Sequence, residues 1–102
     1  MDAAGSRALR VIVWSKPDCP LCDELLEELA ARSRELPQAL ELRNILDNTD
    51  DFNRFRYLIP VFEVEGGALH YPPHTPQSVR AALLAARGSS AQSIAQAGHG
   101  AQ

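Results

Sequence analysis

The spacing of apolar residues changes along the chain and divides its first part into three predicted elements. Residues 8–14 are almost continuously apolar and rich in β-branched side chains, which predicts a strand buried on both faces. Between Pro20 and Pro37, leucines recur at helical spacing and acidic residues fill the first turns, which predicts a helix. Residues 40–45 alternate between apolar and polar and predict a second, less buried strand.

A shorter helix is predicted after this strand. Turn and N-cap formers occupy positions 47–50, and Pro60 stops the helix that they introduce. Within this segment, Phe52, Phe55 and Tyr57 are the side chains that we expect to face the core.

Two short strands and a last helix complete the pattern. Residues 60–65 read as a third strand, in which proline is acceptable because it takes the first position. The glycine pair at 66–67 predicts a hairpin that leads into a brief fourth strand at 68–71. A threonine–proline pair at 75–76 has the form of an N-cap, and the helix that follows is expected to end at 87–88.

The predicted order is therefore β-α-β-α-β-β-α in one domain at residues 8–87. Strands joined by a helix are expected to be parallel with a right-handed crossover, whereas the hairpin makes the last two strands antiparallel. This is an α/β class, and the order is that of a minimal thioredoxin fold with a four-stranded mixed sheet and helices on both faces. Residues 88–102 contain one large apolar residue, Ile94, and are predicted to form a disordered tail.

Composition and charge narrow the function without identifying it. The 102 residues carry a formal net charge of −3, which excludes the basic surface of nucleic-acid-binding domains and gives no attraction to anionic lipids. No apolar run is long enough to cross a membrane, and Asp2 lies where a signal peptide would carry positive charge. We therefore expect a cytoplasmic monomer that binds neither nucleic acid nor membranes.

Cys19 and Cys22 are the most informative residues in the sequence. They form a Cys-Pro-Leu-Cys motif between the first strand and the first helix. A disulfide across so short a loop removes little entropy from the unfolded chain, and small disulfide-stapled scaffolds carry many more cysteines. The spacing therefore favours redox chemistry over a stapling role.

Residues 14–22 (WSKPDCPLC) and residues 59–62 (IPVF) are similar to the matching segments of the glutaredoxin-like family. The resemblance covers residues 8–87 and implies a thiol–disulfide oxidoreductase. It also implies that the peptide bond before Pro60 is cis, which is a minority state even for proline. The substrate implied is a protein or small-molecule disulfide, and another dithiol is a possible electron donor.

Within this resemblance, Cys19 is expected to be the nucleophile and Cys22 the resolving thiol. A cysteine just before a helix lies near unpaired backbone N–H groups that favour the thiolate, and Lys16 adds a positive charge. The acidic residues Asp18, Asp23 and Glu24 oppose this effect, so we expect only a modest lowering of the Cys19 pKa.

The substrate is expected to dock beside the thiols. If the third strand lies antiparallel to the first, Pro60 comes close to Cys19 although the two are distant in sequence. Ile59 would then offer its backbone N–H and C=O to an extended substrate segment. With Lys16 and Pro20, which fixes the first helical turn, these residues form the predicted substrate-binding set.

The segment at 71–76 departs from the pattern of glutathione-using glutaredoxins, which carry Gly-Gly followed by Asp there. Pro72 and Pro73 lack the backbone N–H groups that bind the γ-glutamyl carboxylate. Arg54 or Arg56 could meet a carboxylate instead. We expect that no cofactor is required and that glutathione is a poor ligand.

Three other interpretations stay open at this stage. The chain could be a thioredoxin-fold binding module, or a redox-inert relative, that docks a partner segment beside the cis-proline. The cysteines could be an inert buried pair, since free cysteine is often a small core residue. Cys19 and Cys22 could also bind zinc together with His70 and His74, although the gap between the two pairs is far longer than in a zinc finger.

Overall fold

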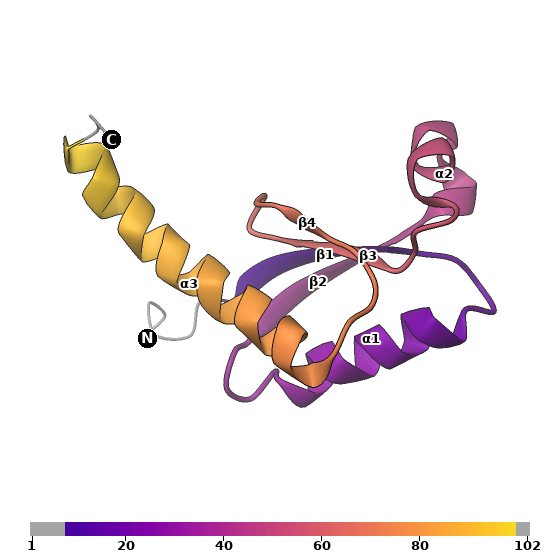
Figure 1. Ribbon diagram of the computed structural model, residues 1–102, viewed down its shortest axis with the longest axis horizontal. Helices are drawn as coiled ribbons and strands as arrows, with labels where there is room; N and C mark the ends of the chain where they lie inside the picture. Colours follow the sequence, from indigo (N-terminus) through magenta and orange to yellow (C-terminus); the bar gives the residue numbers. More distant parts are fainter. Residues whose placement is uncertain (1–7, 100–102) are drawn as a thin grey trace.

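The computed structural model of the protein describes residues 8–99, with side chains through residue 88, and contains one four-stranded sheet (Figure 1). The strands lie in the order β2-β1-β3-β4. The elements are β1 (Leu9–Ser15), α1 (Pro20–Ala31), β2 (Gln38–Asn44), the 3-10 helix η1 (Ile45–Asp47), α2 (Thr49–Phe55), β3 (Val61–Val64), β4 (Leu69–His70) and α3 (Pro76–His99). This is the predicted order, and it confirms the α/β class and the minimal thioredoxin fold.

The pairing of the strands also follows the prediction. β1 is parallel to β2, and it is antiparallel to β3 with Trp14 opposite Val61. In the β3–β4 hairpin, Glu65 and Gly66 have φ of 55° and 71°, and the N–H of Gly67 donates to the carbonyl oxygen of Val64 at 3.0 Å. Two successive residues with positive φ closed by such a bond form a type I′ turn, whose twist matches that of the strands.

The two faces of the sheet carry separate apolar clusters. On one face, α1 and α3 pack against β1 and β3, and the largest buried side chains of this cluster are Leu25, Leu29, Leu36, Phe62 and Leu83. On the other face, the buried residues are Trp14, Ile45, Phe55 and Val61. The rings of Trp14 and Phe55 lie 5.1 Å apart between centroids. Helices therefore cover both faces, as predicted.

Tyr57 corrects one expectation about the core. Its side chain is 85% exposed, whereas the sequence pattern placed it inward with Phe52 and Phe55. The reason is that α2 ends at Phe55, whose carbonyl oxygen accepts from the N–H groups of both Leu58 and Ile59. Tyr57 thus lies in the turn after the helix, where helical spacing no longer decides its direction.

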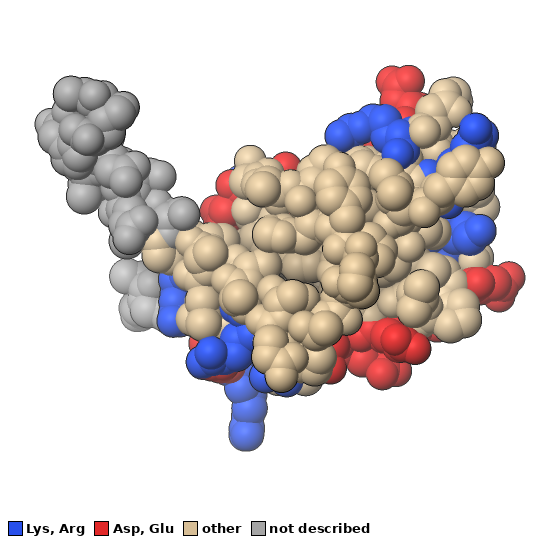
Figure 2. All heavy atoms as spheres, viewed as in Figure 1, with Lys and Arg blue, Asp and Glu red and all other residues tan. Residues whose placement is uncertain are grey.

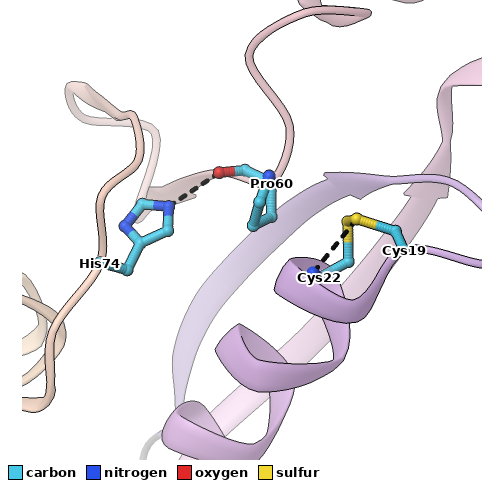
Figure 3. Close-up of a disulfide and its surroundings, with 4 residues drawn as sticks. All are labelled: Cys19, Cys22, Pro60 and His74. Carbon is cyan, nitrogen blue, oxygen red and sulfur yellow. Dashed lines mark hydrogen bonds between the residues drawn. A yellow bond between two sulfur atoms is a disulfide. The ribbon is translucent and has the colours of Figure 1, made fainter.

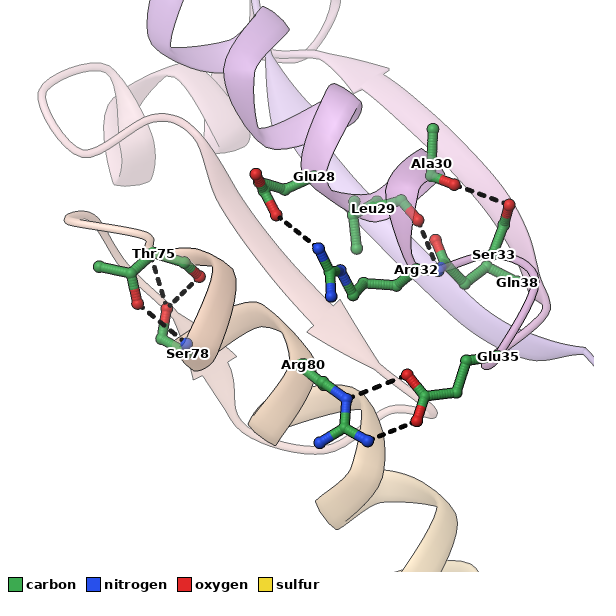
Figure 4. Close-up of polar contacts among 10 residues, drawn as sticks. All are labelled: Glu28, Leu29, Ala30, Arg32, Ser33, Glu35, Gln38, Thr75, Ser78 and Arg80. Atoms are coloured by element: carbon green, nitrogen blue, oxygen red, sulfur yellow. Dashed lines mark hydrogen bonds and ion pairs between the residues drawn. The ribbon is translucent and has the colours of Figure 1, made fainter.

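The start of α3 has the predicted cap, which is reciprocal (Figure 4). The N–H of Ser78 donates to Thr75 Oγ1 at 3.0 Å, and the N–H of Thr75 donates to Ser78 Oγ at 2.9 Å. Two otherwise unpaired donors are satisfied in this way, as in a capping box. One turn further, Arg80 forms a two-pronged ion pair with Glu35 in the loop after α1, which ties the two helices together.

The far end of α3 differs from the prediction. The helix continues through Gly88 to His99, whereas the sequence places its end at residues 87–88. A glycine inside a helix costs only about 1 kcal/mol relative to alanine, and the segment after it is rich in good helix formers. The disordered tail at 88–102 stays a prediction, and residues 100–102 lie outside the described part. No helix within residues 8–99 is both long and apolar enough to cross a membrane.

Candidate active site

The two cysteines lie where β1 passes into α1. β1 ends at Ser15, and an exposed turn follows in which Asp18 has a φ of 59°, a left-handed conformation that aspartate tolerates better than most residues. Cys19 is the N-cap of α1 in extended conformation, and Pro20 takes the first helical position. A disulfide joins Cys19 to Cys22, with 5.2 Å between their Cα atoms (Figure 3).

The two sulfurs differ in environment. Cys22 is 2% exposed because it shares the buried side of α1 with Leu25 and Leu29, whereas Cys19 is only half-buried. The N–H of Cys22 donates to Cys19 Sγ at 3.2 Å, so a backbone donor of the first helical turn is directed at the more exposed sulfur (Figure 3). A donor in this place favours a thiolate over a thiol.

The start of β3 forms the opposite side of the site. The pairing of Trp14 with Val61 brings this end of β3 to the end of β1, and the buried Pro60 lies beside the disulfide (Figure 3). The bond between Ile59 and Pro60 is cis, as the family resemblance implies. The sequence prediction that Pro60 approaches the cysteines is therefore confirmed.

Ile59 requires a correction. Its N–H was expected to be available to a substrate, but it donates to the carbonyl oxygen of Phe55 at 3.1 Å. The same turn that exposes Tyr57 uses this donor. Among the described residues no donor bonds the Ile59 carbonyl, so one half of the predicted backbone pairing with a substrate segment remains.

His74 holds the loop before α3 against the cis-proline. Its Nε2 lies 2.7 Å from the carbonyl oxygen of Pro60 (Figure 3). Because a carbonyl oxygen can only accept, Nε2 carries the hydrogen. The His74 ring also contacts Phe62, with ring centroids 5.2 Å apart. The sequence suggested His74 only as a zinc ligand, and no spacing signal pointed to this contact.

His70 contacts the same phenylalanine. Its ring stacks on Phe62 with centroids 4.8 Å apart. Burial lowers the pKa of His70, and the nearby His74 lowers it further. Within the described residues, no three or more His, Cys, Asp or Glu side chains gather in a group that could hold a metal ion.

The remaining basic candidates lie at the surface. Lys16 is exposed in the turn before Cys19. The Arg54 guanidinium lies 4.5 Å from the ring centroid of Phe55, and that of Arg56 lies 4.9 Å from that of Tyr57. Such cation–π contacts occupy one face of each guanidinium. Neither arginine lines the groove described next.

A groove of about 530 Å³ runs between α1 and the loop before α3. We call it the proline groove. Its apolar lining consists of Leu21, Leu25, Pro60, Pro72, Pro73 and Pro76, and its polar lining consists of Glu24, Glu27, Glu28 and His74. It lies next to the disulfide because Pro60 borders both, and Leu21 directly precedes Cys22. The sequence identified Pro72 and Pro73 as a departure from the glutathione loop, but it did not place them beside the acidic face of α1.

Residues 10–84 match the family described as Glutaredoxin-like domain (DUF836). The chain is similar to the X-ray structure of protein XcR50 from X. campestris, with 25% sequence identity and a TM-score of 0.61 over 70% of this chain and 91% of that one. It shares the fold of the solution NMR structure of protein Ne2328 from Nitrosomonas europaea, with 22% identity and a TM-score of 0.64 over 76% and 93% of the two chains. The family match spans most of the sequence and includes both cysteines and the cis-proline, so the chain belongs to the glutaredoxin-like domain family.

Proposed function

We propose that this protein is a thiol–disulfide oxidoreductase in which Cys19 is the nucleophile and Cys22 the resolving thiol. The observation that carries the proposal is the disulfide between a half-buried Cys19 and a buried Cys22 at the first turn of α1. Exchange through a mixed disulfide requires an accessible sulfur that meets the substrate and a second sulfur behind it, and Cys19 is the more accessible of the two.

In the proposed reaction, the reduced protein attacks a substrate disulfide through the Cys19 thiolate. A bond forms between the Cys19 sulfur and one substrate sulfur, the substrate S–S bond breaks, and the other substrate sulfur leaves and takes up a proton. The Cys22 thiolate then attacks the Cys19 sulfur, which closes the protein disulfide and releases the second substrate thiol. Two electrons pass from the protein dithiol to the substrate, and the two leaving thiolates take up, through solvent, the two protons that Cys19 and Cys22 release when they ionise. The reaction requires no cofactor.

We further propose that an external dithiol, rather than glutathione, returns the disulfide to the reduced state. Pro72 and Pro73 supply no backbone N–H to a γ-glutamyl carboxylate. Glu24 and Glu27 present negative charge on the opposite wall of the same groove. Glutathione carries a net negative charge near neutral pH, so the acidic wall repels it. The proline wall offers no N–H to its carboxylate.

A redox titration with mass-spectrometric trapping tests the proposal. The protein is equilibrated in buffers of defined dithiol/disulfide ratio, alkylated and weighed. We expect one reversible two-electron transition at about −180 to −270 mV, the range of dithiol carriers. Cys19→Ser and Cys22→Ser serve as controls and should show no transition.

Two results would refute the oxidoreductase proposal. One is a pair that stays oxidised under every reductant that reduces a reference dithiol carrier. The other is a pair that cycles but reduces no disulfide substrate. Either would instead support a binding module that docks a segment beside Pro60.

A further inference from the structure

We infer that the proline groove selects disulfide substrates in which the cysteine lies in a basic and apolar segment of a protein. This inference rests on the proposed function and adds the class of substrate. Its basis is the composition of the groove: an apolar floor beside the disulfide and a row of carboxylates along one rim.

The apolar part of the groove is open to a ligand. Leu21 is 58% exposed although it directly precedes Cys22, and it lines the groove together with four prolines, of which Pro60 lies beside the disulfide. Prolines present carbon surface and no backbone N–H, so this wall offers contact area without directed donors. It suits an apolar side chain of a segment that runs past the thiols. A volume of about 530 Å³ is in the range of ligand pockets and accommodates a few side chains.

The charge of the groove has one sign. Glu24, Glu27 and Glu28 line it from successive turns of α1, and no Lys or Arg is among its lining residues. Figure 2 shows acidic side chains along the edge formed by α1, next to an uncharged central face. Glu24 and Glu27 are exposed and form no ion pair within the described residues.

The charge of Glu28 is partly compensated, but one of its carboxylate oxygens lacks a hydrogen-bond partner. Its Oε1 lies 3.6 Å from Arg32 Nη2, which is longer than a hydrogen bond (Figure 4). The same oxygen is buried and has no hydrogen-bond partner. Because this oxygen is buried and faces Arg32, the exposed carboxylates of Glu24 and Glu27 are the groups that an ammonium or guanidinium of a bound segment would meet. A cationic segment is therefore favoured over a neutral or acidic one.

Two matched peptides test the inference. Each carries one cysteine in mixed disulfide with a chromogenic aryl thiol and a leucine beside it, and they differ only in two flanking positions that are lysine or glutamate. At low ionic strength, we expect the reduced protein to react with the lysine peptide about tenfold faster, equivalent to ~1.4 kcal/mol. Because such pairs are screened by salt, the preference should fall to about twofold at 0.5 M salt.

The variant that decides is Glu24→Gln with Glu27→Gln, which should lose most of the preference for lysine. The matched control is Asp47→Asn with Asp50→Asn, which removes the same charge at exposed positions outside the groove and should keep the preference. The rate with a small neutral disulfide is measured for all three proteins and corrects each for any change in Cys19 reactivity, so that the preference is the ratio of the two peptide rates. Equal rates for both peptides with the unmodified protein, or an undiminished preference in the Glu24/Glu27 variant, would overturn the inference.

A binding arm separates this inference from the proposed function. The same peptides with serine in place of cysteine are titrated into the oxidised protein and followed by NMR shifts of α1 amides. Binding of the lysine peptide about tenfold tighter than the glutamate peptide supports the groove even if no disulfide is ever reduced. Failure to reduce the neutral disulfide refutes the proposed oxidoreductase function. Absence of selective peptide binding refutes the proposed selectivity of the groove.

Discussion

The turn that carries the cysteines and the loop at 71–76 border the same groove, but they are built by different means. The cysteine turn follows local rules: a strand end, an N-cap residue, proline at the first helical position and a buried side of α1. The loop is held by long-range contacts, from His74 to the Pro60 carbonyl and from Phe62 to the His74 ring. The reacting atoms thus lie in a locally encoded segment, whereas the opposite wall depends on the rest of the fold.

This difference separates chemistry from recognition. We expect that residues of the loop can be substituted without moving Cys19 or Cys22, provided that the contact of His74 with Pro60 persists. In this chain the loop carries Pro72 and Pro73, which supply no backbone N–H to the groove. We therefore expect substitutions in the cysteine turn to affect every substrate, and substitutions around the groove to affect some substrates only.

The largest effect is expected in the cysteine turn itself. Cys19→Ser should lower disulfide exchange by about a thousandfold or more, because no second sulfur is exposed to start the reaction. Cys22→Ser should still attack but should accumulate a mixed disulfide at Cys19, since nothing remains to resolve it. Single-turnover reactions followed by mass spectrometry give both results. Stable mixed disulfides in Cys19→Ser would reverse the assigned roles.

The choice of electron donor should show the next largest effect, because it depends on the loop. An unsatisfied polar group in a bound ligand costs about 1–3 kcal/mol, so losing the contacts to both charged ends of the γ-glutamyl moiety should weaken glutathione binding about a hundredfold or more. The measurement is reduction of a glutathionylated substrate, driven either by glutathione or by a dithiol. Efficient turnover with glutathione alone would mean that Arg54, Arg56 and the Ile59 carbonyl suffice.

The same contrast between local and long-range features describes what could be predicted from the sequence. The Cys-Pro-Leu-Cys motif, the cap at Thr75 and the hairpin at 66–67 depend on neighbours in the chain, and all were predicted from short patterns. The predictions of an inward Tyr57 and of an available Ile59 N–H were wrong, because the end of α2 is set by hydrogen bonds to the Phe55 carbonyl, which helical spacing does not reveal.

The groove could not be predicted from the sequence for a further reason. The acidic residues of α1 look like ordinary partners of a helix N-terminus, and Pro72 and Pro73 look like a loop. Only the tertiary structure places them on opposite walls of one cavity. The one sequence feature that could have indicated an apolar groove is the density of prolines at 72–76, shortly after the motif that carries Pro60.

Within the cysteine turn, a smaller contrast should separate the two thiols. Alkylation of the reduced protein near neutral pH should label Cys19 at least about tenfold faster than Cys22, because Cys22 is 2% exposed and packs with the core side of α1. Peptide mapping at short times gives the two rates. The same reaction in denaturant is the control, in which both should be labelled at similar rates. Equal rates in the folded protein would contradict the assigned roles.

In the loop, the cap at Thr75 should matter for stability and little for chemistry. Thr75→Ala removes the hydroxyl that accepts from the Ser78 N–H, and should lower the free energy of unfolding by about 1 kcal/mol. Thr49→Ala is the matched control, since α2 is capped by Asn48 rather than by Thr49, and should stay within about 0.5 kcal/mol. Urea denaturation measures both. A Thr75→Ala variant that loses exchange with a small neutral disulfide would contradict the separation of loop and cysteine turn.

The smallest effect is a pH dependence at His70, on the strand that leads into the loop. Burial against Phe62 and the neighbouring His74 lower its pKa below the ordinary value of 6.5, so the unfolded chain binds more protons at this position than the folded one. The free energy of unfolding should therefore be constant above about pH 7 and fall as the pH falls through 6.5 towards the lower pKa of the folded state. The effect should be smaller than that of the Thr75 cap, because the ring is only half-buried and water screens its charge. His70→Phe keeps the stacking on Phe62 and should lose this part of the slope, which urea denaturation between pH 5 and 8 would measure. An unchanged slope in this variant would assign the pH dependence to other groups and would show that protonation of His70 costs the folded protein nothing.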